Sequence, residues 1–172
     1  MTCAAQVSAS THLGAVDAFG FNQWEEADSA LGRPVSSNQV QYHLLERRQG
    51  RSLLPYAREQ ERIVIAYSPL AQGLLGGKHG AGNVPQGLRA SFGIFNSDSL
   101  KRAPAVLEVL GEVGSHYGAA PAQVALARLL LDRQVMVIPG ARSVAQLEAN
   151  AAAADLLLAP GDAMRIEQAS RV

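Results

Sequence analysis

Apolar positions along the chain recur with two periods, about 3.6 residues and two residues. The longer period marks amphipathic helices, which are bounded by residues that start or stop a helix. We expect helices over residues 24–31, 49–60, 100–117, 120–132 and 143–154, and from residue 160 onward. Short apolar or alternating segments predict strands over residues 38–43, 62–67 and 135–138, and a fourth near residues 16–19.

The strands predicted at residues 38–43 and 62–67 are joined by one helix. A βαβ unit of this kind holds its strands parallel, with a right-handed crossover. Parallel strands followed by long loops are typical of an α/β barrel or a doubly wound sheet. A complete barrel takes roughly 250 residues, and this chain has 172. We therefore expect an α/β fold, an incomplete TIM-type (β/α) barrel with three or four parallel strands and flanking helices.

Composition narrows the function classes. The 15 basic and 15 acidic residues balance, so the sequence lacks the charge excess of a nucleic-acid-binding protein. Cys3 is the one cysteine, which excludes an intramolecular disulfide and a zinc cluster. The apolar tract at residues 149–160 is too short to span a membrane, and residues 1–12 do not resemble a signal peptide. We expect a cytoplasmic protein with no metal site.

A glycine-rich segment follows the strand at residues 62–67, and it superficially resembles a phosphate-binding loop. A P-loop has four residues between its two glycines, then a lysine and a hydroxyl residue. Gly73 and Gly77 enclose three residues, and His79 stands in the hydroxyl position after Lys78. The segment is therefore not expected to be a P-loop.

Four blocks of sequence occur in one order along the chain. They read S-N-Q-V-Q-Y-H-L-L-E-R-R (37–48), I-A-Y-S-P-L-A-Q-G-L-L-G-G-K (65–78), A-P-A-Q-V-A-L-A-R-L-L (120–130) and V-I-P-G-A-R-S-V-A-Q-L-E-A-N (137–150). Together they resemble the C-terminal half of the aldo-keto reductase barrel. Residues 21–172 are thus expected to form a partial barrel, and residues 1–20 stay unassigned.

The resemblance implies a binding surface for NADP(H). Tyr67 would stack on the nicotinamide ring, and Gln39 would bind its carboxamide. The pyrophosphate would lie along Ser68, Leu70, Gln72 and Gly73. The adenosine end would lie near Gly140, Arg142, Gln146 and Asn150.

A physical argument supports the adenosine end. Ser143 and Gln146 have the spacing of a capping box at the start of a helix. The free N–H groups of that helix would favour an anion, and Arg142 adds a guanidinium group for the 2′-phosphate. Taken singly, Arg142 reads equally well as a solvated charge. For Tyr67, a position in the core is the less favoured of the two readings.

The resemblance also implies a catalytic set of tyrosine, lysine, aspartate and histidine, which the family carries in the N-terminal half of its barrel. Only Lys78 and Lys101 are lysines, and neither ends a predicted strand. Phe19 and Gly20 stand where the family has a Ser-Asn pair. We expect a truncated or rearranged chain with no catalytic residue, inactive by itself. The alternatives are a non-catalytic NADP(H)-binding or interaction module and a non-functional fragment.

An incomplete barrel leaves a sheet face and sheet edges uncovered. Apolar groups near Val40, Ile63 and Ile65 would then meet water, and open edges can pair with another chain. We therefore expect self-association or binding to a complementary barrel half.

Overall fold

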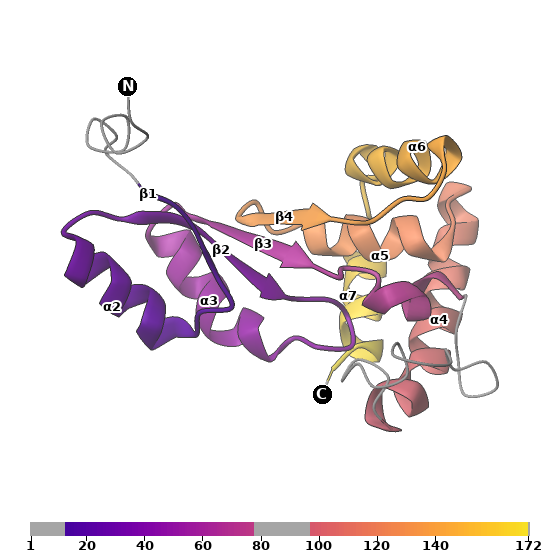
Figure 1. The fold of residues 1–172 in the computed structure, drawn as a ribbon. Helices are drawn as coiled ribbons and strands as arrows, with labels where there is room; N and C mark the ends of the chain where they lie inside the picture. The colour runs from indigo at the N-terminus through magenta and orange to yellow at the C-terminus, as the bar shows by residue number, and fades with distance from the viewer. Residues whose placement is uncertain (1–12, 78–96, 172) are drawn as a thin grey trace.

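The computed structural model describes residues 13–77 and 97–171, and its strands form a single parallel sheet (Figure 1). The sheet has four strands in the order β1-β2-β3-β4. They span Leu13–Asp17 (β1), Val35–Gln41 (β2), Ile63–Tyr67 (β3) and Val135–Ile138 (β4). The expected α/β fold, with a parallel sheet and flanking helices, is confirmed.

Helices alternate with the strands along the chain. They span Phe21–Leu31 (α2), Arg48–Glu59 (α3), Ser97–Tyr117 (α4), Pro121–Leu130 (α5), Val144–Ala152 (α6) and Pro160–Ala169 (α7). Two 3₁₀ segments, Ala71–Gly76 (η1) and Ala153–Asp155 (η4), follow β3 and α6. Helices α2, α3 and α5 contact β2, β3 and β4 respectively, which places the connecting helices against the sheet.

Two strands lie earlier in the chain than expected. The strand predicted at residues 38–43 is β2, which ends at Gln41, because His43 leaves the ladder and forms an isolated bridge with Glu46. The strand predicted near residues 16–19 is β1, which ends at Asp17 because Ala18 has a φ of 58°. Much of the glycine-rich segment, including Lys78 and His79, lies outside the described residues, as does Cys3.

One face of the sheet is packed against helices. Val40 and Ala66 are neighbours in the parallel register, and both are buried. The apolar core on this side includes Trp24, Leu53 and Leu110, which are fully buried. Apolar burial of this kind is the main favourable term in folding, so this face stabilises the fold.

The opposite face of the sheet is only partly covered among the described residues. Ile65 lies between Gln39 and Met136 in the register, and Tyr67 lies next to Ile138. The side chains of Met136 and Ile138 are 51% and 44% exposed. Strand β3 therefore alternates between buried and half-buried residues, although its composition suggested a strand covered on both faces.

The expectation that Val40 would face the open side is wrong. Side chains alternate along a strand, and the register aligns Gln39, not Val40, with Ile65. Val40 therefore points toward the helices and is 1% exposed. Ile63 and Ile65 are half-buried on the other face.

No described helix combines the length and the apolar character that crossing a lipid bilayer would require.

Candidate functional site

A cavity lies beyond the carboxyl ends of β3 and β4. We call it the strand-end cavity; its volume is about 670 Å³. One wall is the segment after β3, and the other is the segment after β4 with the first turns of α6. Its lining residues include Ser68, Leu70, Gln72, Gly73, Gly140, Arg142, Gln146 and Asn150. In open α/β sheets, ligands bind outside the carboxyl ends of the strands, so this cavity is the natural candidate.

The wall after β3 has an unusual backbone. Ser68, Ala71 and Gln72 have φ values of 50°, 50° and 52°, and Gly73 has a φ of 101°. Such angles are uncommon for residues with a Cβ atom, and each costs about 1–3 kcal/mol. Strained backbone of this kind clusters at ligand sites. The segment that follows β3 is therefore a candidate ligand-binding segment.

The opposite wall is held by hydrogen bonds at the start of α6. The Oγ atom of Ser143 accepts from the backbone N–H of Gln146 at 3.2 Å, as the sequence predicted. The side-chain oxygen of Gln146 accepts from the backbone N–H of Arg142 at 2.8 Å, whereas the predicted capping box would have it accept from that of Ser143. Asn150 donates to the carbonyl of Gly140 at 3.5 Å. Both amide side chains thus shape the loop that lines the cavity.

The positive charge in this cavity comes from Arg142. Its side chain is exposed, and no carboxylate among the described residues forms an ion pair with it. The first turn of α6 adds backbone N–H groups and the positive end of the helix dipole. Together they can bind an anion such as a phosphate group.

A second cavity, about 490 Å³, lies beside Tyr67 at the ends of β1, β2 and β3. We call it the Tyr67 cavity. It is lined by Ala18, Val40, Gln41, Glu46, Arg48, Gln49 and Tyr67. Arg48 and Glu46 form an ion pair at 2.8 Å on its rim. An aromatic ring among amide and charged groups can hold a flat polar group such as a carboxamide-bearing ring.

Gln39, the predicted carboxamide partner, lines neither of these cavities. It lies on the same face as Tyr67, one step back along the sheet, and its amide donates to Asp17 at 3.4 Å. Gln41 is the direct neighbour of Tyr67 in the register. Alternation along β2 could have identified Gln41, because residues 39 and 41 share a face.

The side chain of His43 links Gln41 to the turn that follows β2. Its Nε2 atom is 3.3 Å from the side-chain nitrogen of Gln41, and its Nδ1 atom accepts from the backbone N–H of Leu45 at 3.2 Å. Burial lowers the pKa of His43 to about 4, against an opposing effect of Glu46. The ring is therefore neutral at physiological pH and acts as a structural hydrogen-bonding group.

Further lining residues of the strand-end cavity were not predicted. They include Ala120, Ala122 and Gln123 at the start of α5 and Ile138 at the end of β4. Nothing local marks them, since α5 reaches the cavity through tertiary packing against η1 and β4.

A cluster of Tyr56, Asp28 and Arg62 joins α2, α3 and β3. The hydroxyl of Tyr56 donates to Asp28 at 2.7 Å, and Arg62 pairs with the same oxygen. Burial and the hydrogen bond to Asp28 raise the pKa of Tyr56 to about 12. None of the three residues lines a cavity described above, so we interpret the cluster as structural.

Comparison with known proteins gives a consistent result. The family model described as "Aldo/keto reductase family" matches residues 12–171. An uncharacterized oxidoreductase of Mycobacterium tuberculosis is 47% identical over 156 residues, which are 91% of this chain and 48% of that protein. The chain therefore spans about half the length of this curated relative.

Solved structures agree on the fold. The glycerol dehydrogenase from Gluconobacter oxydans superposes with a TM-score of 0.77 at 22% identity, over 90% of this chain and 47% of that one. A mutant of Gox0644 in complex with NADPH gives a TM-score of 0.64 at 20% identity, over 90% of this chain and 45% of that one.

Proposed function

This chain belongs to the aldo/keto reductase family, and we propose that it supplies the NADP(H)-binding surface of an oxidoreductase that interconverts carbonyls and alcohols. One observation carries the proposal. Eight of the ten residues predicted to bind the cofactor line the strand-end cavity. The complex of a structural relative with NADPH is consistent with this choice of cofactor.

The cofactor phosphates would lie between the two walls of the strand-end cavity. Pyrophosphate would contact the strained segment around Gln72 and Gly73, where the backbone can approach a ligand closely. The ribose 2′-phosphate would lie by Arg142 and the first N–H groups of α6. Gln146 and Asn150 would hold the loop and offer their remaining polar atoms to the adenosine.

The nicotinamide end would lie in or beside the Tyr67 cavity, on the ring of Tyr67. Its carboxamide would hydrogen-bond to Gln39 or to Gln41, which lie on one face of β2. Hydride transfer would take place above this ring, with the cofactor supplying the hydride.

We propose that no tyrosine or lysine among the described residues donates the proton for carbonyl reduction, since Tyr67 would stack on the nicotinamide ring. Tyr56 and Tyr117 donate to Asp28 and Asp162, and Tyr42 is buried. Lys101, the one lysine among the described residues, is exposed on α4. General acid catalysis contributes typically 10²–10⁴-fold. We therefore propose that the chain alone gives aldehyde-dependent NADPH oxidation near background, and a steady rate that a point mutation abolishes would contradict this.

An NADPH titration of the purified chain, followed by cofactor fluorescence, tests the proposed binding surface. Arg142→Ala should weaken NADPH binding by about tenfold to a hundredfold, because a charge-assisted bond to phosphate is lost. Binding of NADH, which lacks the 2′-phosphate, should change little. Arg133→Ala is the matched control, since Arg133 is exposed and lines neither cavity. Equal affinity for the two nucleotides would contradict the assignment.

A non-catalytic nucleotide-binding or interaction module is the second candidate function. The exposed apolar side chains of Met136 and Ile138 favour it, together with the outer edges of β1 and β4, with which no other described strand pairs. Such a face would be covered by a second copy of the chain or by a complementary barrel half. Parallel sheets normally have both faces covered, which supports an association of this kind.

A further inference from the structure

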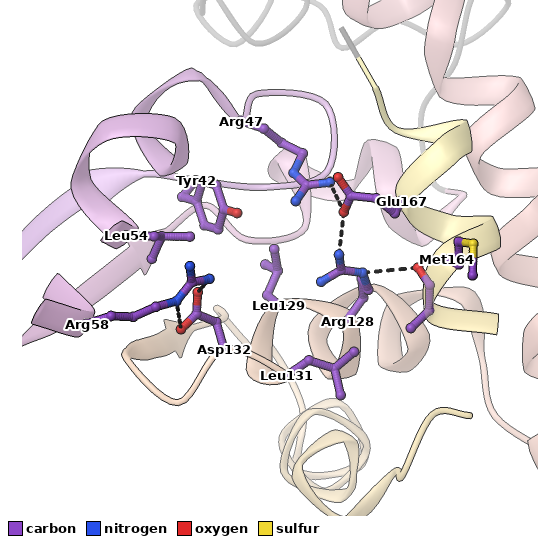
Figure 2. A pocket seen from close by; sticks show the side chains of 11 residues that line it. Tyr42, Arg47, Leu54, Arg58, Arg128, Leu129, Leu131, Asp132, Met164 and Glu167 are labelled. Atoms are coloured by element: carbon purple, nitrogen blue, oxygen red, sulfur yellow. Dashed lines mark hydrogen bonds and ion pairs between the residues drawn. The ribbon is translucent and has the colours of Figure 1, made fainter. Parts of the chain in front are cut away.

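A third cavity lies on the outer side of the molecule, between α3, α5 and α7 (Figure 2). We call it the outer cavity; its volume is about 340 Å³. It shares no lining residue with the strand-end cavity. The proposed cofactor surface therefore does not account for it.

Arginine side chains dominate the polar part of the outer cavity. Arg47 from the start of α3 and Arg128 from α5 approach Glu167 of α7 from two sides, as Figure 2 shows. Both donate to the same Oε2 atom, Arg47 at 2.5 Å. Arg58 pairs with Asp132 at 2.5 Å. Three guanidinium groups thus face two carboxylates, which leaves one positive charge in excess.

The ionisation of these groups supports that charge count. Burial opposes the charge on Arg47, but the hydrogen bond and charge of Glu167 raise the pKa of Arg47 above its usual value. Burial alone would raise the pKa of Glu167, whereas Arg47 and Arg128 hold it below its usual range. Glu167 is consequently ionised at neutral pH. It is the one carboxylate among the described residues that pairs with these two guanidinium groups, which also donate to the Ser170 hydroxyl and the Ala163 carbonyl.

The rest of the outer cavity is apolar. Tyr42, Leu54 and Leu129 are buried beneath it. Leu131 and Met164, on its rim, are 45% and 57% exposed. An apolar rim beside an excess guanidinium charge suits a ligand with one anionic end and one apolar end.

We propose that the outer cavity binds a small organic monocarboxylate with an apolar body. A carboxylate matches the planar fork of a guanidinium group, and one negative charge neutralises the single excess positive charge. The apolar body lies along Leu131 and Met164. A ligand with two or more negative charges would leave the cavity with a negative excess beside Glu167 and Asp132.

The test uses 4-phenylbutyrate as the probe and 4-phenylbutanamide as its uncharged counterpart, with the complete chain labelled for ¹H–¹⁵N NMR. We expect the carboxylate to shift amide resonances around Leu131, Asp132 and Met164. The amide probe should bind at least tenfold more weakly. Saturating NADPH should change the probe's affinity by less than twofold, because the cavities share no residue.

Two variants locate the interaction. Arg128→Met removes the excess charge and should weaken 4-phenylbutyrate binding at least tenfold. Arg165→Met is the matched control, because Arg165 lies on α7 but does not line the cavity, and it should change the affinity less than twofold. If Arg128→Met does not fold, Leu131→Glu is the second test. It adds a negative charge at an exposed position on the rim and should weaken 4-phenylbutyrate binding.

Two results would overturn the proposal. One is equal affinity for the carboxylate and the amide probe. The other is an affinity for 4-phenylbutyrate that Leu131→Glu leaves unchanged.

Discussion

The two faces of the sheet differ although the same strands build both. On one face, Val40, Val64 and Ala66 are buried against helices. On the other, Ile65 is half-buried and Met136 is half-exposed. The residue types on the two faces of β3 are almost equally apolar, so composition does not distinguish them. The difference shows that burial depends on which elements lie opposite a strand, and the described elements cover one face more fully than the other.

The covered face should carry most of the stability. Trp24 is fully buried, and its indole N–H donates to the carbonyl of Val35 at 3.2 Å. Trp24→Ala should therefore lower the free energy of unfolding by about 3–5 kcal/mol. Met136→Ala, on the open face, should cost less than about 1 kcal/mol. Urea denaturation of the two variants measures both, and similar losses would contradict the contrast between the faces.

Acid should lower the stability of the fold through His43. The pKa of His43 falls from 6.5 to about 4 in the folded chain, mainly because the ring is buried. Between these two values the unfolded chain binds a proton that the folded chain does not bind. Stability is thus complete above about pH 6.5 and falls as the pH drops toward 4, by about 3 kcal/mol in all.

The free energy of unfolding, measured at several pH values between 7 and 4, tests this pH dependence. His43→Gln should flatten it, because the titrating group is removed. An equal pH dependence in the two proteins would show that other groups control the acid response.

The smallest expected effect concerns the open face. If this face associates with another copy, Met136→Lys should weaken self-association about fivefold or more, since it replaces about 1 kcal/mol of apolar burial with a charge. Met136→Lys should change the free energy of unfolding by less than about 1 kcal/mol. Sedimentation velocity across a concentration series measures the association. A wild-type chain that stays monomeric at tens of micromolar and binds no hydrophobic dye would contradict the proposal.

Local pattern predicted several elements well. Strand β4 lies where its four apolar residues predicted it, and α6 begins at the Ser143 cap. These features depend on neighbours within four residues, so sequence is sufficient for them. The ends of β2 were less predictable, because Tyr42 and His43 continue its alternation but are buried outside the ladder.

The candidate site was also predictable in part, where its residues lie in short continuous segments. Resemblance to the family identified the segments after β3 and β4, and the structure brings eight of those residues to one cavity. It did not identify the contribution of α5, nor the placement of Gln41 beside Tyr67. The outer cavity combines residues more than a hundred positions apart, such as Arg47 and Glu167. No local pattern marks such a pair.

By itself, the sequence determined the type and order of the elements, the family, and the chemistry available after each strand. These properties follow from short-range periodicity, capping and motif. Only the tertiary structure decided which strand face is covered, which arginines share a carboxylate, and which loops meet in a cavity. The physical reason is that burial and charge pairing depend on distances between segments that are remote in the chain, and the parallel register and helix packing set those distances.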